Sequence, residues 1–143
     1  MNYKWPLMND NITKHDRQAV ISFLQKNERL TQSKYVREFE YKWSKWLDIK
    51  NSIFVNSGSS ANYIMMSMVR DLMGKGEVIV PPIGWVSDIT SVINAGMVPV
   101  FVDVDLENMS ITNNIKNAIT EKTKAIILVH TLGFNAINNE IIK

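Results

Sequence analysis

The feature of this sequence that most constrains its fold is an alternation of short apolar runs with segments of helical periodicity. Four runs have the length and β-branched content of buried strands, at 53–55, 78–80, 98–102 and 125–129, and the last is the clearest. The segments between them repeat apolar side chains every three or four positions, as amphipathic helices do. Strands that alternate with helices form βαβ units. The sequence therefore predicts the α/β class, with a mainly parallel sheet covered by helices on both faces.

Two helices are expected before the first of these runs. Thr13 is a candidate N-cap with Asp16 three positions later, and the helix that it opens is expected to end near Asn27. A second helix is expected between Ser33 and Leu47, where aromatic and aliphatic residues recur every three or four positions. The first part of the chain is therefore predicted to be a helical extension that precedes the α/β domain.

Further helices are expected after each of the first three runs. The helix after 53–55 is expected to close at Gly74 and Gly76, and the helix after 78–80 at Gly96. A helix is also expected to open at Asn135 without a stop signal before the end of the chain, so the sheet is expected to be incomplete. The expected apolar side chains are Val86, Ile89 and Ile93 in one helix, and Ile115 and Ile119 in another that Thr112 caps.

Composition excludes several functional classes. The chain has no cysteine, which excludes disulfide scaffolds, thiolate zinc sites and cysteine nucleophiles, and its two histidines leave little material for a metal site. No metal is therefore expected. A net charge of +2 does not favour nucleic acid or an anionic membrane as a partner. No segment approaches the roughly 20 apolar residues of a membrane span, and the N-terminus has no apolar signal core, so a cytoplasmic protein is expected.

The turn after the first run has the composition of an anion-binding site. Ligands of α/β proteins bind beyond the carboxyl ends of the strands, and here Val55 is followed by Asn-Ser-Gly-Ser-Ser. Gly58 permits a tight turn, while Ser59 and Ser60 place hydroxyl groups beside the free N–H groups of a helix N-terminus, which attracts phosphate. A serine that caps the helix explains the local pattern more simply, so both interpretations stay open.

Other candidate residues follow the later runs. Trp85 comes after the second run, where it either stacks on a planar ligand or packs in the interior. Asp103 and Asp105 follow the third run, and turn formation with hydrogen bonding is favoured over a metal site because no other ligands lie nearby. His130 follows the fourth run, and a hydrogen-bonded structural role is favoured over catalysis.

Taken together, these segments resemble the DegT/DnrJ/EryC1/StrS sugar aminotransferases, which are pyridoxal-phosphate enzymes of fold type I. The resemblance covers nearly the whole chain, and several segments in the right order are more specific than any one of them. The segments that carry it are Arg29–Ser33, Val36–Glu40, Val55–Asn62, Glu77–Pro82, Trp85–Ser87, Pro99–Asp105 and Val129–Gly133.

The resemblance implies a site for pyridoxal 5'-phosphate. Ser59 and Ser60, with the backbone around Gly58, would bind the cofactor phosphate, and Trp85 would stack on the pyridine ring. It also implies a nucleotide-sugar substrate, glutamate as the usual amino donor, and a homodimer. Residues 51–143 would then be part of the cofactor-binding large domain, and residues 1–50 its helical N-terminal extension.

Family members are much longer than this chain, which matches only their opening portion. The lysine that binds the cofactor covalently and the acidic residue that keeps the pyridine nitrogen protonated are expected beyond residue 143, so no catalytic residue is assigned within the chain. The chain alone is therefore expected to be inactive. Asp103, Asp105 and His130 match recurring positions of the family, without an assigned chemical step.

Three functions stay open at this point. The leading one transfers an amino group onto a keto group of a nucleotide-linked sugar, in the synthesis of cell-surface polysaccharides or antibiotic sugars. The second is a 3-dehydratase of 4-keto-6-deoxy nucleotide sugars, in which a histidine replaces the lysine. The segment His130–Gly133 also resembles the corresponding segment of that branch of the family. The third is a non-enzymatic remnant or binding subunit that keeps the phosphate-binding turn and a dimer surface.

Overall fold

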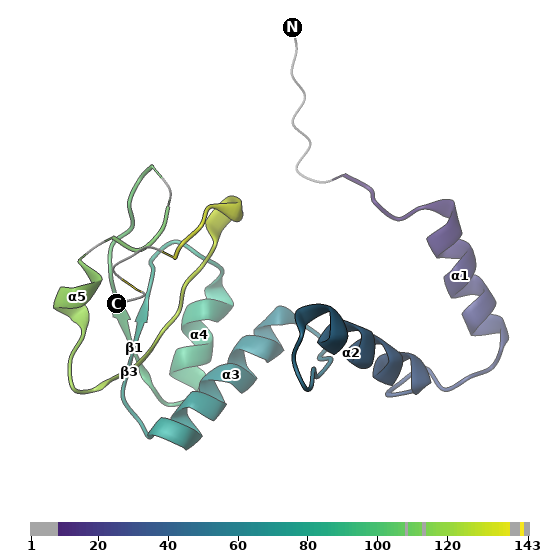
Figure 1. Cartoon of the computed structure of the whole chain (residues 1–143), viewed down its shortest axis with the longest axis horizontal. Helices are drawn as coiled ribbons and strands as arrows, with labels where there is room; N and C mark the ends of the chain where they lie inside the picture. Colours follow the sequence, from purple (N-terminus) through teal and green to yellow (C-terminus); the bar gives the residue numbers. More distant parts are fainter. Residues whose placement is uncertain (1–8, 108, 113, 138–140, 142–143) are drawn as a thin grey trace, which may run out of the picture. The chain divides into compact units, whose positions relative to one another are not determined.

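The computed structural model describes residues 9–107, 109–112, 114–137 and 141 of the chain. The chain divides into two compact units, a first unit of residues 1–54 and a second unit of residues 55–143, and each is described by itself (Figure 1). The helix predicted from Asn135 onward falls largely on residues outside the described ranges. Within those ranges, no helix combines the length and the apolar character needed to cross a lipid bilayer.

The first unit contains the two predicted helices. Helix α1 (Lys14–Gln25) begins at a capping box, in which Asp16 N–H donates to Thr13 Oγ1 at 3.3 Å and Thr13 N–H donates to Asp16 Oδ2 at 2.8 Å. Helix α2 (Lys34–Leu47) follows Ser33 and ends at Asp48, whose φ of 54° is left-handed. Both predicted helices are confirmed, with ends within two residues of those expected.

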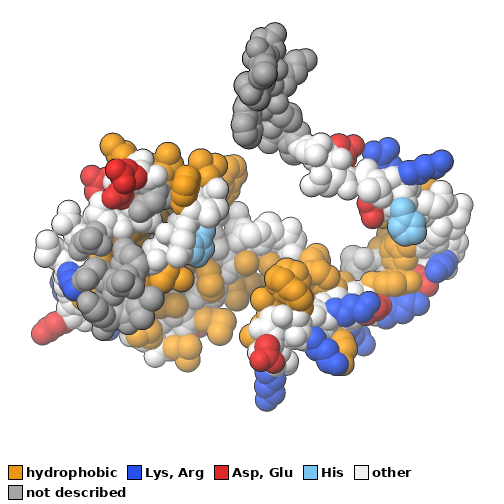
Figure 2. All heavy atoms as spheres, turned by 45° about the horizontal axis from the view of Figure 1, so that its top comes forward, with side chains coloured by type: hydrophobic (Ala, Val, Ile, Leu, Met, Phe, Trp, Pro, Cys, Tyr) orange, Lys and Arg blue, Asp and Glu red, His pale blue; other side chains and the backbone are white. Residues whose placement is uncertain are grey.

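The first apolar run, at 53–55, does not form the strand that the sequence predicts. The N–H of Phe54 donates to Glu40 Oε1 of α2 at 2.8 Å, so a side chain takes the place of a neighbouring strand. The Phe54 ring meets Phe39 of α2 edge-on, with centroids 5.6 Å apart, while Ile53 is 81% exposed. A strand requires a paired backbone, and local β propensity alone does not provide one. Figure 2 shows other apolar side chains on the surface as well.

The second unit is a parallel sheet with helices, which confirms the predicted fold class. Its elements in chain order are α3 (Gly58–Met73), β1 (Glu77–Val80), α4 (Val86–Asn94), β2 (Val98–Phe101), α5 (Ile115–Ala118), β3 (Thr123–Ile126) and the short 3-10 helix η1 (Thr131–Gly133). The strand order is β2-β1-β3, and both pairings are parallel. Val78 of β1 lies opposite Pro99 of β2 and Ala125 of β3.

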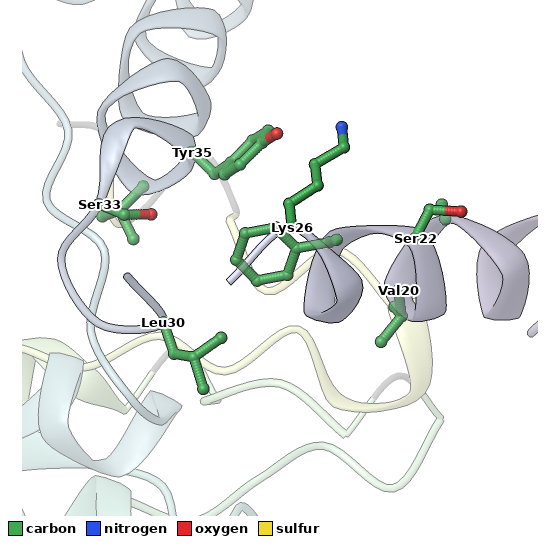
Figure 3. A pocket seen from close by; sticks show the side chains of 9 residues that line it. Val20, Ser22, Lys26, Leu30, Ser33 and Tyr35 are labelled. Carbon is green, nitrogen blue, oxygen red and sulfur yellow. The ribbon is translucent and has the colours of Figure 1, made fainter. Parts of the chain in front are cut away.

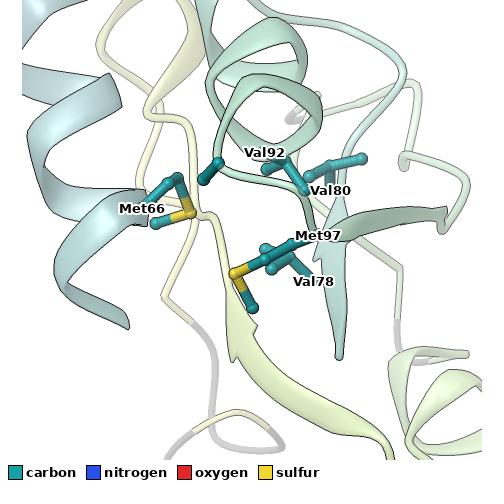
Figure 4. Packing of buried hydrophobic residues seen from close by; sticks show 6 residues of the cluster. Met66, Val78, Val80, Val92 and Met97 are labelled. Atoms are coloured by element: carbon teal, nitrogen blue, oxygen red, sulfur yellow. The ribbon is translucent and has the colours of Figure 1, made fainter. Parts of the chain in front are cut away.

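Alternate residues of β1 face two layers of helices. Val78 and Val80 pack against residues of α3 and α4 on one face, as Figure 4 shows. Ile79 packs against Ile115 of α5 on the other face. These three strand residues have no exposed surface at all, so β1 is the centre of the unit. The prediction of helices on both faces is confirmed.

The run at 125–129 is less buried than the sequence predicts. Strand β3 covers only Thr123–Ile126, and all four of its residues are half-buried. The reason is its place at the edge of the described sheet, where it pairs with β1 on one side only. The N–H of Ile127 still donates to the carbonyl of Ile79 at 2.8 Å, so the contact continues one residue beyond the strand.

Helix α4 buries its predicted apolar face only in part. Ile89 is half-buried and packs against the core, whereas Val86 and Ile93 are 66% and 54% exposed. The fully buried residues of the helix are Ser87, Ser91 and Val92. The helix contacts both α3 and β1, and its short serine side chains lie on the side that makes these contacts. Apolar periodicity therefore identified the helix and one of its core residues, Ile89, but not the other residues that it buries.

The predicted helix ends are confirmed, and one predicted cap is wrong. Gly74 follows α3 and Gly96 follows α4, with positive φ angles of 78° and 74° that favour glycine. The N-cap of α5 is Asn114 rather than Thr112. Ile119, which was expected on the apolar face of α5, follows the helix and is 51% exposed.

Candidate functional site

The candidate site lies at the carboxyl edge of the sheet, within the second unit. The segment that follows β1 contains Gly84, and the segment that follows β3 contains Val129. The two segments lie close together, since a Cβ atom built on Gly84 would be 3.4 Å from Val129 Cγ2. Asn62, near the start of α3, hydrogen-bonds to Ser87 and Asp88 in the first turn of α4. Parallel sheets bind ligands at this edge. The first turns of α3 and α4 therefore contain the candidate binding groups.

The first turn of α3 combines a serine cap with free donor groups. Ser57 is the N-cap, and its Oγ accepts the N–H of Ser60 at 3.1 Å. The hydroxyl of Ser60 donates to Asn56 Oδ1 at 2.6 Å. Among the described residues, no acceptor is found for the backbone N–H groups of Gly58 and Ser59. The cap and an anion site are therefore compatible, because they use different groups.

These free groups fit a phosphate. Gly58 is the first residue of the helix and has no positive φ, so its backbone conformation does not itself require glycine. Glycine leaves open space at this position. A Cβ built on Gly58 would meet no atom within 4 Å, so a ligand can approach the backbone. The hydroxyl of Ser59 is exposed beside it, and the helix dipole of α3 favours negative charge at this end. Ser60 would first have to release Asn56.

Trp85 presents an exposed ring on a fixed backbone. It directly precedes α4, and its side chain is 72% exposed, so it is not packed in the interior of this chain. Its N–H donates to Asp88 Oδ2 at 2.9 Å, and its carbonyl accepts the N–H of Asp88 at 2.9 Å. An exposed indole held in this way can stack on a planar ligand.

Asn62 and Asp88 are site residues that the sequence analysis did not identify. Asn62 Nδ2 donates to Asp88 Oδ1 at 2.9 Å and to Ser87 Oγ at 3.2 Å. The signal for Asp88 was its position three residues after Trp85, where a carboxylate can accept the backbone N–H of the N-cap residue. No local pattern indicates its partner Asn62, which lies 26 positions earlier in the chain.

The other candidate residues have structural roles. Asp103 Oδ1 accepts the N–H of Val104 at 2.8 Å, and Asp105 Oδ1 accepts the N–H of Glu107 at 2.7 Å. The predicted hydrogen-bonding role is confirmed for both residues, and the predicted turn is confirmed at Asp105. His130 Nδ1 accepts a backbone N–H at 3.0 Å, so it is hydrogen-bonded as predicted. In the described ranges, no three His, Asp or Glu side chains are grouped so that they could hold a metal ion.

A separate cavity lies in the first unit, between α1 and α2 (Figure 3). Its volume is about 540 Å³, its lining is mostly apolar, and none of the predicted site residues contributes to it. The residues that line it are Ala19, Val20, Ser22, Phe23, Lys26, Leu30, Ser33, Tyr35 and Val36.

Comparisons with known proteins agree on one family. The model of the DegT/DnrJ/EryC1/StrS aminotransferase family matches residues 10–141. The chain is similar to the dTDP-4-dehydro-2,6-dideoxy-D-glucose 3-dehydratase of Saccharopolyspora spinosa, with 39% identity over 105 residues, or 68% of this chain and 23% of that protein.

Two solved structures are similar to the chain in both sequence and fold. One is the Escherichia coli GDP-4-keto-6-deoxy-D-mannose 3-dehydratase with bound hydrated pyridoxal phosphate, with 29% identity and a TM-score of 0.78 over 87% of this chain and 33% of that one. The other is Helicobacter pylori PseC, an aminotransferase involved in the biosynthesis of pseudoaminic acid, with 28% identity and a TM-score of 0.74 over 86% and 33%. The chain spans about a third of each.

Proposed function

Because the chain belongs to the DegT/DnrJ/EryC1/StrS aminotransferase family, we propose that its second unit binds pyridoxal 5'-phosphate in an enzyme that acts on nucleotide-linked sugars. The first turn of α3 binds the cofactor phosphate through Gly58, Ser59 and Ser60, and Trp85 stacks on the pyridine ring. In this proposal residues 51–143 are part of the large domain, and residues 1–50 are its helical extension.

The observation that carries the proposal is the first turn of α3. Two adjacent N–H groups, those of Gly58 and Ser59, lack an acceptor within the described part of the chain, and the space beside Gly58 is open. A phosphate supplies acceptors for both groups and for the Ser59 hydroxyl. The exposed indole of Trp85 is on the same unit, at the start of the helix that α3 contacts. A similar chain, the E. coli dehydratase, has pyridoxal phosphate bound.

The residues of this chain contribute binding and orientation to the reaction. Pyridoxal phosphate, when bound, would supply a ring that takes up the electron pair left on the carbon that loses its proton. The N–H groups of Gly58 and Ser59 fix the phosphate, and the dipole of α3 offsets part of its charge. Trp85 fixes the plane of the ring and keeps water from one of its faces. Both contacts hold the reacting atoms in one geometry, which lowers the entropic part of the barrier.

The proposed reaction is transfer of an amino group, from glutamate, to a keto group of the sugar, in a cytoplasmic homodimer. A 3-dehydratase reaction is the second candidate, because the proteins similar to this chain include several 3-dehydratases. The two reactions differ in the residue that meets the reactive carbon of the cofactor, a lysine in the aminotransferases and a histidine in the dehydratases. Sequencing the whole gene identifies that residue and decides between them.

Calorimetric titration of the chain with pyridoxamine 5'-phosphate tests the cofactor site. This form carries an amine instead of an aldehyde, so it does not condense with exposed lysines. We expect it to bind at least about tenfold more tightly than pyridoxamine. Pyridoxamine lacks the phosphate and therefore cannot make the charge-assisted hydrogen bonds to the turn of α3. Ser59→Ala should weaken binding of the phosphorylated form alone, while the matched control Ser22→Ala, in the first unit, should not. Equal affinities for the two compounds would refute the phosphate site.

A further inference from the structure

We propose that Asp88, held by Asn62, is a positioning residue that fixes the ring-stacking Trp85 relative to the phosphate-binding turn of α3. The inference rests on the proposed function, since it explains how two contacts to one cofactor keep a constant separation. Asp88 itself touches neither the phosphate nor the ring in this proposal. It acts through the backbone of Trp85.

The two oxygens of the Asp88 carboxylate bind donors from two different helices. Oδ2 accepts the N–H of Trp85 at 2.9 Å, which is the bond of an ordinary capping box. Oδ1 accepts from Asn62 Nδ2 of α3 at 2.9 Å, and a capping box has no need of this second bond. One carboxylate therefore ties the start of α4 to α3.

Glycine at position 84 leaves room for this carboxylate. A Cβ atom built there would lie 2.8 Å from Asp88 Oδ2, so a larger residue would require the oxygen to shift. Asn62 is held by a second bond, to Ser87 Oγ at 3.2 Å, and Ser87 is only 7% exposed. Hydrogen bonds thus hold both members of the pair.

The position of Asn62 on α3 connects this pair to the phosphate site. Asn62 follows Ser59 by three residues, so the two side chains lie on neighbouring positions of one helix face. The connection runs from the turn of Ser59, through Asn62 and Asp88, to the backbone of Trp85. A ligand with a phosphate at one end and a ring at the other needs these two contacts at a set distance, and second-layer hydrogen bonds commonly provide that precision.

An exchange of the two side chains provides the variants. Asn62→Asp places two carboxylates at hydrogen-bond distance, and their repulsion breaks the link. In the double variant Asn62→Asp/Asp88→Asn, the new amide at 88 donates to the carboxylate at 62 while its oxygen still accepts from Trp85. Asp88→Asn alone keeps the link if the side-chain amide of Asn62 rotates by 180°, so that its oxygen accepts from the new amide at position 88. Asn62→Ala removes the donor without adding a charge, and replaces N62D if that variant does not fold.

The readout is the ratio of two affinities, for pyridoxamine 5'-phosphate and for inorganic phosphate. Phosphate reports on the turn of α3 alone, so its dissociation constant should stay within about twofold in every variant. Asn62→Asp should lower the affinity for pyridoxamine 5'-phosphate relative to that for phosphate about fivefold, toward the value of Trp85→Ala. The reason is that the pyridine ring of the ligand loses its stacking contact with Trp85. The double variant should restore it. Amide exchange at Trp85, measured without ligand, should accelerate in N62D and recover in the double variant.

Each contrary outcome has a distinct meaning. If wild type binds pyridoxamine 5'-phosphate no better than inorganic phosphate, the proposed function fails and the positioning role with it. If wild type shows the preference but N62D keeps the same ratio, the positioning role is overturned and the proposed function stands. If N62D weakens both ligands equally, the pair only stabilises the fold, which also overturns the positioning role.

Discussion

Replacing Gly84 with alanine should destabilise the second unit, because the new methyl group displaces the Asp88 carboxylate. The added Cβ would lie 2.8 Å from Asp88 Oδ2 and 3.4 Å from Val129 Cγ2. The carboxylate must move by several tenths of an ångström, which weakens its bonds to Trp85 and Asn62. Loss of a helix cap costs about 0.5–2 kcal/mol. We therefore expect the free energy of unfolding to fall by about 0.5–2 kcal/mol.

Gly58→Ala is the matched control for this substitution. Its Cβ would meet no atom within 4 Å, and Gly58 has no positive φ, so alanine fits the conformation. Alanine at such a position stabilises by about 0.4–1 kcal/mol, since it restricts the unfolded chain. The same methyl group should weaken binding of pyridoxamine 5'-phosphate, because it fills the space that the phosphate needs. Gly84→Ala thus lowers stability, whereas Gly58→Ala lowers affinity without lowering stability.

The free energy of unfolding of both variants is measured by urea denaturation, with the NMR signals of amides in the second unit as the probe. A change below about 0.5 kcal/mol for Gly84→Ala, the range of an ordinary surface substitution, would show that Asp88 moves freely and refute the reasoning.

Three further predictions concern stability. Ile79→Ala, in the fully buried centre of β1, should cost about 2–5 kcal/mol in urea denaturation, whereas Leu106→Ala, at a side chain that is 85% exposed, should change stability by less than about 0.5 kcal/mol. His130→Ala should cost about 1–3 kcal/mol, because it leaves a buried backbone N–H without its acceptor, and an unchanged midpoint would contradict this. The hydrogen bonds from Thr13 lower the pKa of Asp16, so the contribution of this cap should be complete above about pH 4 and disappear as the pH falls through the lowered pKa. Amide exchange in the first turn of α1 measures that loss, which should be absent in Asp16→Asn.

Local signals predicted the helices well, because the groups that start and end a helix are close in sequence. Thr13 and Asp16 form the expected capping box, and Gly74 and Gly96 follow their helices with positive φ. The strands were predicted less well. Residues 53–55 have the composition of a strand but no strand beside them, since Glu40 binds the N–H of Phe54.

Burial in the sheet depended on strand order, which the sequence did not reveal. The run at 125–129 is the more apolar one, yet β1 is the buried centre because it pairs on both sides. The site was predictable only where its residues are neighbours in sequence. The turn at Ser57 to Ser60 could be recognised as a cap and an anion site, whereas the bond between Asn62 and Asp88 joins residues 26 positions apart.

The most direct test of the cofactor site is an NMR titration of the ¹⁵N-labelled chain with pyridoxamine 5'-phosphate. If the first turn of α3 binds the phosphate and Trp85 stacks on the ring, the largest shifts should occur at the backbone amides of Gly58 and Ser59 and at the indole N–H of Trp85. Those three signals should saturate at the same ligand concentration. Shifts confined to the cavity of the first unit, or no saturable shift at Gly58 and Ser59, would contradict the proposed site.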